Sequence, residues 1–254
     1  MPFMKINGLK TYYESKGKGE AIVFIHCPVH PSDVYRPELE ELSSDYHVIS
    51  MDIRGHGRTA SSPDPWDFSD IANDLKELLG RLGIEKAWLC GYSAGCSIAF
   101  EFTFKYPGAV KGLIQLGPVP KVEDGLLYFI VKNGIRLSLI DKPALFLAFF
   151  GAIINTNDWQ RFLSLLKASL PTNGLDASQF YHAFLHYDCT KRLPSIKVPV
   201  LLVYGEKDRI TGKYALPMKG FLPDSTLIFI KKCGHEIPLK RSVELNLRIK
   251  EFIS

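Results

Sequence analysis

The fold is decided by one stretch of the sequence, Ala87-Trp88-Leu89-Cys90-Gly91-Tyr92-Ser93-Ala94-Gly95. Its first four residues form an apolar run typical of a buried strand, and the residues after Ser93 follow a helix-like pattern that stops at Pro107-Gly108. A Gly-x-Ser-x-Gly sequence between a strand and a helix predicts a turn so sharp that the serine hydroxyl stands clear of the sheet. The two glycines fit this turn, because a side chain at either position would crowd the neighbouring strand and helix.

Similar apolar runs recur along the chain and alternate with amphipathic stretches. The runs cover residues 21–25, 48–51, 87–90, 110–116, 200–203 and 227–230. The clearest helical pattern starts near Ser69, a predicted N-cap, and places Ile71, Leu75, Leu78, Leu79 and Leu82 on one face. Residues 3–6 and 9–13, joined by Asn7-Gly8, predict a β-hairpin, and the last residues of the chain predict a helix. Strands that alternate with helices predict an α/β fold with a doubly wound, mostly parallel sheet.

This alternation is interrupted between residues 121 and 190. The segment is rich in aromatic and aliphatic side chains but has no strand-like run, and Phe146, Phe149 and Phe150 lie at its centre. We therefore expect three or four short helices, inserted as a cap into a core made of residues 1–120 and 191–254. Such a cap closes over the strand ends, which predicts an apolar cleft with few charges above Ser93.

Composition narrows the class of protein. The chain has 254 residues, a net charge of +4 and 46% hydrophobic residues, as expected for a globular domain that binds no nucleic acid. No signal peptide and no run long enough for stable membrane insertion is present. The five cysteines have no CxxC spacing, which favours a reducing, cytoplasmic environment over disulfides or zinc. No metal or dinucleotide motif occurs, so no cofactor is expected.

Two further residues have the chemistry that would activate Ser93. A serine hydroxyl needs a base to take its proton, and a histidine held by a carboxylate suits that role. Asp208 follows the run at 200–204, and His235 follows the run at 227–230. Since the carboxyl ends of parallel strands meet at one edge of a sheet, we expect Ser93, Asp208 and His235 to converge there. Glu123 or Asp124 is an alternative for the acid.

These features resemble the α/β-hydrolase family of serine esterases and their relatives. The resemblance covers Phe24-Ile25-His26, Met51 to Arg58, Gly91 to Gly95, Val203 to Asp208 and Gly234-His235. It implies a nucleophile elbow at Ser93 and, for the inserted segment, only the position of a cap. His56 corresponds to a structural turn in that family, so it is given no catalytic role.

The loop after residues 21–25 departs from the family pattern. A serine hydrolase stabilises its oxyanion with two N–H groups, one of which is expected from Ala94. The second maps onto Pro28, which has no N–H. Three explanations are open: Val29 or Cys27 donates from a reshaped loop, with Val29 preferred; the side chain of His30 donates; or the oxyanion hole is incomplete. Cys27, Pro28, His30 and Tyr92 are expected to contact substrate.

Three functions fit this sequence. The first is hydrolysis of a small to medium hydrophobic carboxylic ester, thioester or lactone through an acyl-enzyme on Ser93. The second, implied by the resemblance alone, is C–C bond hydrolysis or cofactor-free perhydrolysis with the same residues. The third is a slow or non-catalytic ligand receptor, which the proline at position 28 would suit. The natural substrate and the oligomeric state cannot be inferred from the sequence.

Overall fold

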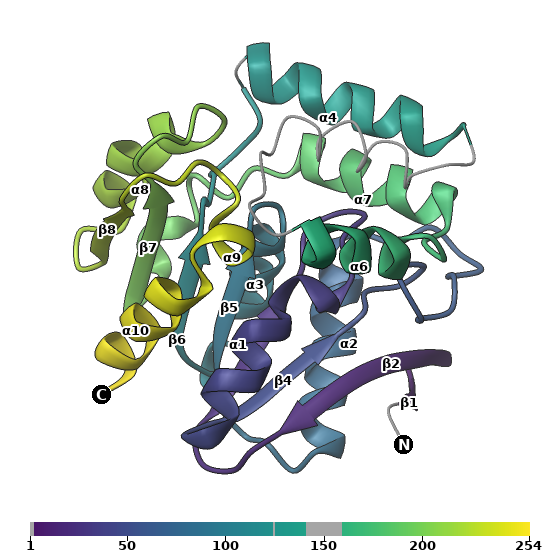
Figure 1. Ribbon diagram of the computed structural model, residues 1–254, viewed down its shortest axis with the longest axis horizontal. Helices are drawn as coiled ribbons and strands as arrows, with labels where there is room; N and C mark the ends of the chain where they lie inside the picture. The colour runs from purple at the N-terminus through teal and green to yellow at the C-terminus, as the bar shows by residue number, and fades with distance from the viewer. Residues whose placement is uncertain (1–2, 124, 141–158) are drawn as a thin grey trace.

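The computed structural model describes residues 3–123, 125–140 and 159–254 (Figure 1). Its centre is a sheet of eight strands in the order β1-β2-β4-β3-β5-β6-β7-β8. The strands are β1 (Phe3–Ile6), β2 (Leu9–Lys16), β3 (Ala21–Ile25), β4 (His47–Met51), β5 (Ala87–Tyr92), β6 (Val110–Leu116), β7 (Val200–Gly205) and β8 (Thr226–Ile230). β1, β2 and β4 pair antiparallel, and all other pairs are parallel. The predicted strands and the mostly parallel sheet are confirmed.

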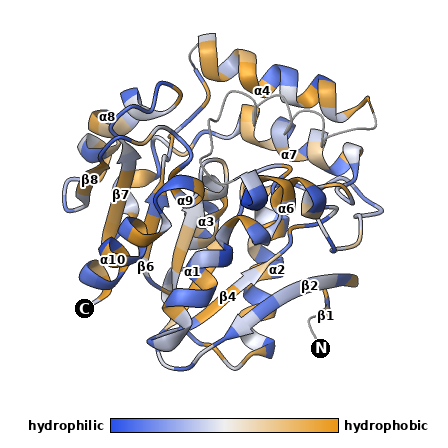
Figure 2. Cartoon of the chain, viewed as in Figure 1, coloured by the Kyte–Doolittle hydropathy of each residue, from blue (hydrophilic) through white to orange (hydrophobic). Residues whose placement is uncertain are grey.

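Successive residues of the central strands pack on opposite faces of the sheet. In β3, Val23 and Ile25 join the hydrophobic cluster on one face, whereas Ile22 and Phe24 join the cluster on the other. This alternation explains why the strands are apolar throughout, since both faces are covered (Figure 2).

Helices cover the two faces in separate layers. The cluster on one face includes residues of α2 (Phe68–Arg81), α3 (Gly95–Lys105) and α8 (Ala215–Phe221). The other includes residues of α1 (Arg36–Glu41), the short α9 (Ile237–Lys240) and α10 (Ser242–Ile253). The sheet is therefore doubly wound, as predicted, and the helix expected at the end of the chain is present.

The predicted start of α2 is wrong by two residues. The N-cap is Asp67 rather than Ser69: the Asp67 side chain accepts hydrogen bonds from the Ser69 and Asp70 N–H groups, and the Asp70 side chain accepts the Asp67 N–H. A carboxylate at each end of this capping box satisfies the free N–H groups of the first turn, so the helix begins at Phe68.

Three described helices lie between β6 and β7: α4 (Gly125–Ser138), α6 (Trp159–Ser169) and α7 (Gly174–His186). In Figure 1 they lie above the sheet, at the end toward which β7 points. α4 and α7 pack closely at Gly134, where a Cβ would lie 2.8 Å from the Tyr181 ring. The predicted central aromatic residues Phe146, Phe149 and Phe150 lie outside the described residues.

One carboxyl group is buried in the core without a partner. Glu38 of α1 is fully buried, and neither of its carboxyl oxygens has a hydrogen-bond partner within the described part of the chain. Burial raises the pKa of Glu38 from 4.5 to about 8, although the charge of Arg161 acts in the opposite direction. The side chain is therefore largely protonated in the folded protein at neutral pH.

This burial predicts a pH-dependent contribution to stability. Between pH 4.5 and 8 the unfolded chain loses a proton from Glu38 that the folded chain retains, so folding becomes less favourable as the pH rises. Glu38→Gln removes this dependence. We compare the melting temperature of Glu38→Gln with that of the unmodified protein at each pH. The difference between them should shift in favour of the variant by several degrees from pH 5 to pH 8. If the difference in melting temperature between Glu38→Gln and the unmodified protein were the same at pH 5 and pH 8, the assignment would be contradicted.

Candidate active site

The turn between β5 and α3 has the predicted sharp geometry. Ser93 adopts a φ of 54°, in the left-handed region that side chains other than glycine rarely occupy. A Cβ at Gly91 would lie 2.7 Å from the Cys96 Cα, and a Cβ at Gly95 would lie 2.4 Å from the Ile25 carbonyl oxygen. The two glycines thus allow the helix and strand β3 to approach the turn that carries Ser93.

Asp208 and His235 form a hydrogen-bonded pair on the loops after β7 and β8. His235 Nδ1 lies 2.9 Å from Asp208 Oδ2. The other carboxylate oxygen accepts the N–H groups of Ile210 and Thr211, at 2.8 and 2.9 Å. Burial opposes ionisation of Asp208, but the hydrogen bonds and charge of His235, together with the bonds from Thr211, outweigh it and hold the pKa of Asp208 well below its usual range.

Three neighbours fix the position of the His235 ring. The Thr211 hydroxyl donates to Asp208 Oδ2 at 2.6 Å and lies 3.2 Å from His235 Nδ1. The Tyr92 ring packs against the imidazole with 5.3 Å between ring centroids. Gly117, at a φ of 64°, leaves room for the imidazole, because a Cβ there would lie 2.8 Å from His235 Cε1. Neither Thr211, three residues after Asp208, nor Gly117, just after the run at 110–116, carries a sequence signal that predicts a contact with His235.

The alternative acid does not occupy a comparable position. Glu123 is exposed and forms an ion pair with Lys121, whereas His235 already pairs with Asp208. Asp124 lies outside the described residues.

Ser93 and His235 open onto one cavity of about 490 Å³. It is lined by Cys27, Pro28, His30, Tyr92, Ser93, Ala94, Leu127, Ile130, Val131, Tyr181, Phe184, Lys207, Arg209, Ile210, Lys232, Gly234, His235, Glu236 and Lys240. All four residues expected to contact substrate, Cys27, Pro28, His30 and Tyr92, are among them. Val29 is not, and its side chain is fully buried.

The predicted cleft is apolar on one side, but the prediction that it has few charges is wrong. Leu127, Ile130, Val131, Tyr181 and Phe184, from α4 and α7, form an apolar wall. The loops after β7 and β8, together with the last residue of α9, add four basic residues and one acidic residue to the lining. The composition of the inserted segment could not reveal these charges, because they come from the core segments around Asp208 and His235.

The loop after β3 has an unusual backbone. His26 Nε2 accepts the Ile53 N–H at 2.8 Å, so the Nδ1 atom of His26 carries the proton and donates to the Cys27 carbonyl oxygen, also at 2.8 Å. This bond fixes the peptide that precedes Pro28. Val29 then adopts a φ of 70°, a strained conformation for a β-branched residue. Within the described residues, no protein acceptor engages the N–H of Val29 or of Ala94.

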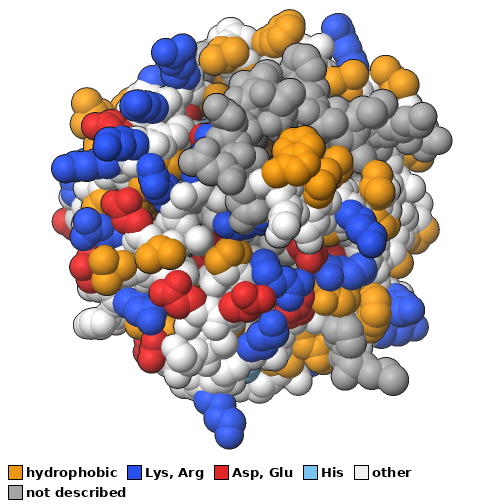
Figure 3. Space-filling model, in the orientation of Figure 1, with side chains coloured by type: hydrophobic (Ala, Val, Ile, Leu, Met, Phe, Trp, Pro, Cys, Tyr) orange, Lys and Arg blue, Asp and Glu red, His pale blue; other side chains and the backbone are white. Residues whose placement is uncertain are grey.

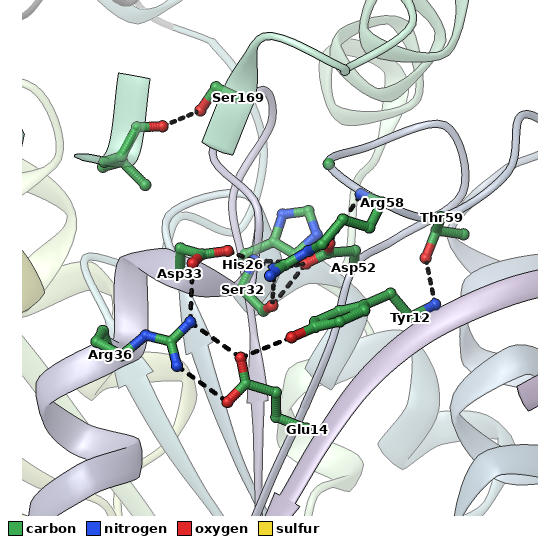
Figure 4. A network of polar contacts seen from close by, with 12 residues as sticks. Tyr12, Glu14, His26, Ser32, Asp33, Arg36, Asp52, Arg58, Thr59 and Ser169 are labelled. Carbon is green, nitrogen blue, oxygen red and sulfur yellow. Dashed lines mark hydrogen bonds and ion pairs between the residues drawn. The ribbon is translucent and has the colours of Figure 1, made fainter. Parts of the chain in front are cut away.

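A buried ionic network holds the far end of this loop (Figure 4). Asp52 accepts hydrogen bonds from the Ser32 N–H and hydroxyl and from the Arg58 side chain. Arg58 also pairs with Asp33, and its guanidinium lies 3.5 Å from the centroid of the Tyr12 ring. Burial alone would raise the pKa of Asp52, but the bonds and charge of Arg58 lower it below its usual value. The network anchors the loop that contains Cys27, Pro28 and Val29.

Two more histidines lie near this loop. Burial lowers the pKa of His30 to about 4, so the imidazole is neutral at neutral pH, and its Nδ1 has no partner within the described residues. His56 is fully buried, packs against the Phe180 ring and donates its Nδ1–H to the Arg54 carbonyl oxygen, at 2.8 Å. It does not line the cavity. This placement agrees with the structural role expected for His56.

A second cavity, of about 630 Å³, lies between the start of α2, α3 and α7. It contains neither Ser93 nor His235 and is lined in part by Trp66, Glu101 and Arg192.

In the described part of the chain no helix has the length and apolar character needed to cross a membrane.

The fold described above matches a known family, since the model of the alpha/beta hydrolase fold matches residues 20–242. The chain belongs to the α/β-hydrolase family.

Individual relatives cover nearly the whole chain. It is 28% identical over 260 residues to the AB hydrolase superfamily protein YisY of Bacillus subtilis, covering 95% of this chain and 94% of the relative. It is 26% identical to the pimeloyl-[acyl-carrier protein] methyl ester esterase of Aliivibrio salmonicida, with 95% of each chain covered. Among solved structures, an esterase from Exiguobacterium antarcticum superposes with a TM-score of 0.90 at 23% identity, covering 99% of this chain and 98% of that one.

Proposed function

We propose that the protein is a serine hydrolase that cleaves a small to medium carboxylic ester, thioester or lactone through an acyl-enzyme on Ser93. The observation that carries this proposal is the Asp208–His235 hydrogen bond of 2.9 Å at the cavity that Ser93 also lines. The volume of about 490 Å³ suits a small ligand, and the apolar wall from α4 and α7 suits its hydrophobic part. The five buried, unpaired cysteines favour a reducing compartment such as the cytoplasm.

The proposed reaction has two halves. The Ser93 hydroxyl attacks the carbonyl carbon and passes its proton to His235 Nε2, while Asp208 stabilises the imidazolium through Nδ1. The tetrahedral intermediate then expels the alcohol or thiol, which takes the proton from His235, and an acyl-enzyme remains. Water, deprotonated by His235, attacks this ester and releases the acid and the Ser93 hydroxyl.

We assign the oxyanion donors to the N–H groups of Ala94 and Val29. Both are without a protein acceptor within the described residues. The strained backbone at Val29 supports its assignment, because such strain is concentrated at functional sites. The competing donor is the side chain of His30, which lines the cavity.

Substitution of His30 separates these two donors. Loss of one oxyanion donor typically lowers kcat by about 10²–10³-fold. If Val29 donates, His30→Ala leaves kcat within about threefold of the starting value. This change is much smaller than the fall in kcat expected when an oxyanion donor is lost. A loss of about 100-fold in His30→Ala that His30→Asn restores in part would assign the donor to His30 instead.

Turnover of p-nitrophenyl acetate and butyrate tests the proposed function. Release of many equivalents of p-nitrophenol per protein molecule supports a hydrolase. Release of one equivalent followed by no further reaction would instead support a ligand receptor that is acylated once.

Perhydrolysis is the second candidate, because the chain is 29% identical over 223 residues to a putative non-heme chloroperoxidase of Synechocystis, covering 80% of this chain and 79% of the relative. An acyl-enzyme attacked by hydrogen peroxide in place of water would yield a peracid. Bromide oxidation that requires both acetate and hydrogen peroxide, and that exceeds ester hydrolysis in rate, would favour this candidate. Nothing in the cavity specifically favours C–C bond hydrolysis.

A further inference from the structure

The cavity that contains Ser93 and His235 has a strongly basic side. Lys207, Arg209, Lys232 and Lys240 line it, and Glu236 is the acidic residue among its lining residues. Glu236 is already paired with Lys240, at 2.6 Å. Within the described residues Lys207, Arg209 and Lys232 take part in no ion pair, so three positive charges at this cavity have no partner.

Neighbouring acids do not neutralise this group. Asp208 lies between Lys207 and Arg209 in sequence, but its carboxylate is occupied by His235, Thr211 and Ile210. Glu206 accepts the backbone N–H of Lys232, but it is exposed and does not line the cavity. On the face drawn in Figure 3, Lys and Arg side chains are numerous over β7, β8 and α8, with acidic side chains among them. Like charges that converge on one cavity repel one another, and an anionic ligand would relieve this repulsion.

The basic and apolar linings come from different parts of the fold. The three unpaired basic residues lie on the loops after β7 and β8, which also supply Asp208 and His235. The apolar wall comes from α4 and α7. Since His235 must give its proton to the departing oxygen or sulfur, the leaving group has to lie on the side of the cavity formed by the His235 loop.

We propose that the substrate carries a negative charge, a carboxylate or phosphate, on its alcohol or thiol part, and that Lys207, Arg209 and Lys232 bind this group. The acyl part is uncharged and lies against the α4 and α7 side chains. This inference rests on the proposed function of the same site. It also explains why the basic residues flank Asp208 and His235 rather than the apolar wall.

Two matched pairs of esters test the position of the charge. 3-Carboxyphenyl butyrate and 3-carbamoylphenyl butyrate differ only by a charge on the leaving group. Monophenyl glutarate and its terminal amide differ by a charge on the acyl group. We expect kcat/KM for the charged leaving group to exceed that of its neutral partner by about tenfold at low ionic strength, as for three partly exposed ion pairs, and to fall with added salt. The charged acyl group should give no such advantage.

Charge-removing variants connect this preference to the named residues. The combined substitution Lys207→Gln, Arg209→Gln and Lys232→Gln should abolish the preference, so that kcat/KM for 3-carboxyphenyl butyrate no longer exceeds that for 3-carbamoylphenyl butyrate. Lys231→Gln is the matched control, because Lys231 is exposed and adjacent in sequence but does not line the cavity. A preference that survives the triple substitution, or that Lys231→Gln removes equally, would overturn the proposal.

Binding separates this inference from the proposed function. If no ester is turned over, the proposed function fails, and calorimetry with Ser93→Ala still decides the charge inference. Tighter binding of 3-carboxyphenyl butyrate than of its carbamoyl partner, lost in the triple variant, would support an anion site. Equal affinity for the two would overturn it.

Discussion

Ser93→Ala is expected to lower kcat for p-nitrophenyl butyrate by on the order of 10⁶-fold, as in other hydrolases that lose the nucleophile. Without the Ser93 hydroxyl no acyl-enzyme forms, and only slow attack by water within the cavity remains. The fold should be retained, because alanine can adopt the left-handed backbone conformation of Ser93, at a φ of 54°, as well as serine does. The substitution also removes no backbone hydrogen bond of the turn. Steady-state rates with the purified variant, beside a circular dichroism melting curve, measure both expectations.

Ser97→Ala is the matched control for this experiment. Ser97 lies four residues further along the same segment, is buried in α3, and does not line the cavity. Its substitution should leave kcat nearly unchanged. Turnover by Ser93→Ala at more than a small fraction of the original rate would exclude Ser93 as the nucleophile, and Cys27 would then be the next residue to test, since it lines the same cavity.

Asp208→Asn is expected to lower kcat by about 10⁴-fold with little change in KM. The carboxylate of Asp208 accepts from His235 Nδ1 and is ionised, because its pKa is held well below the usual range. An amide at this position cannot stabilise the imidazolium that forms when His235 takes the Ser93 proton. Its N–H₂ group would also favour the tautomer of His235 in which Nε2 carries the proton, so that Nε2 could no longer act as a base.

Glu123→Gln serves as the control and also tests the alternative acid. Glu123 is exposed and paired with Lys121, so its substitution should leave kcat unchanged. A large loss in Glu123→Gln, together with near-normal rates in Asp208→Asn, would assign the acid to the loop after β6 and contradict the geometry described above.

The sheet and the nucleophile turn could be predicted because local sequence determines them. Strands buried on both faces, such as β3 and β7, are apolar at every position, and Gly91 and Gly95 are required by backbone contacts shorter than a side chain would allow. The start of α2 was misplaced because Ser69 and Asp67 are both good N-caps, and only the reciprocal bond with Asp70 decides between them.

Features of the site that depend on tertiary contacts could not be predicted in the same way. Thr211 and Gly117 support His235 from two different loops, and no spacing in the sequence places them beside it. The apolar composition of the inserted segment describes only one side of the cavity, so it does not predict the basic lining. Lys207, Arg209 and Lys232 flank the predicted site residues in the sequence, but only the fold shows that they line the cavity.

Covalent labelling of Ser93 tests the central claim most directly. The protein is treated with one equivalent of a fluorophosphonate and digested, and the peptides are mapped by mass spectrometry. We expect stoichiometric phosphonylation on the peptide that contains Ser93, and none in Ser93→Ala or after prior acid unfolding. Absence of labelling in the folded protein, or an adduct on another residue, would contradict the assignment of Ser93 as a nucleophile activated by His235 and Asp208.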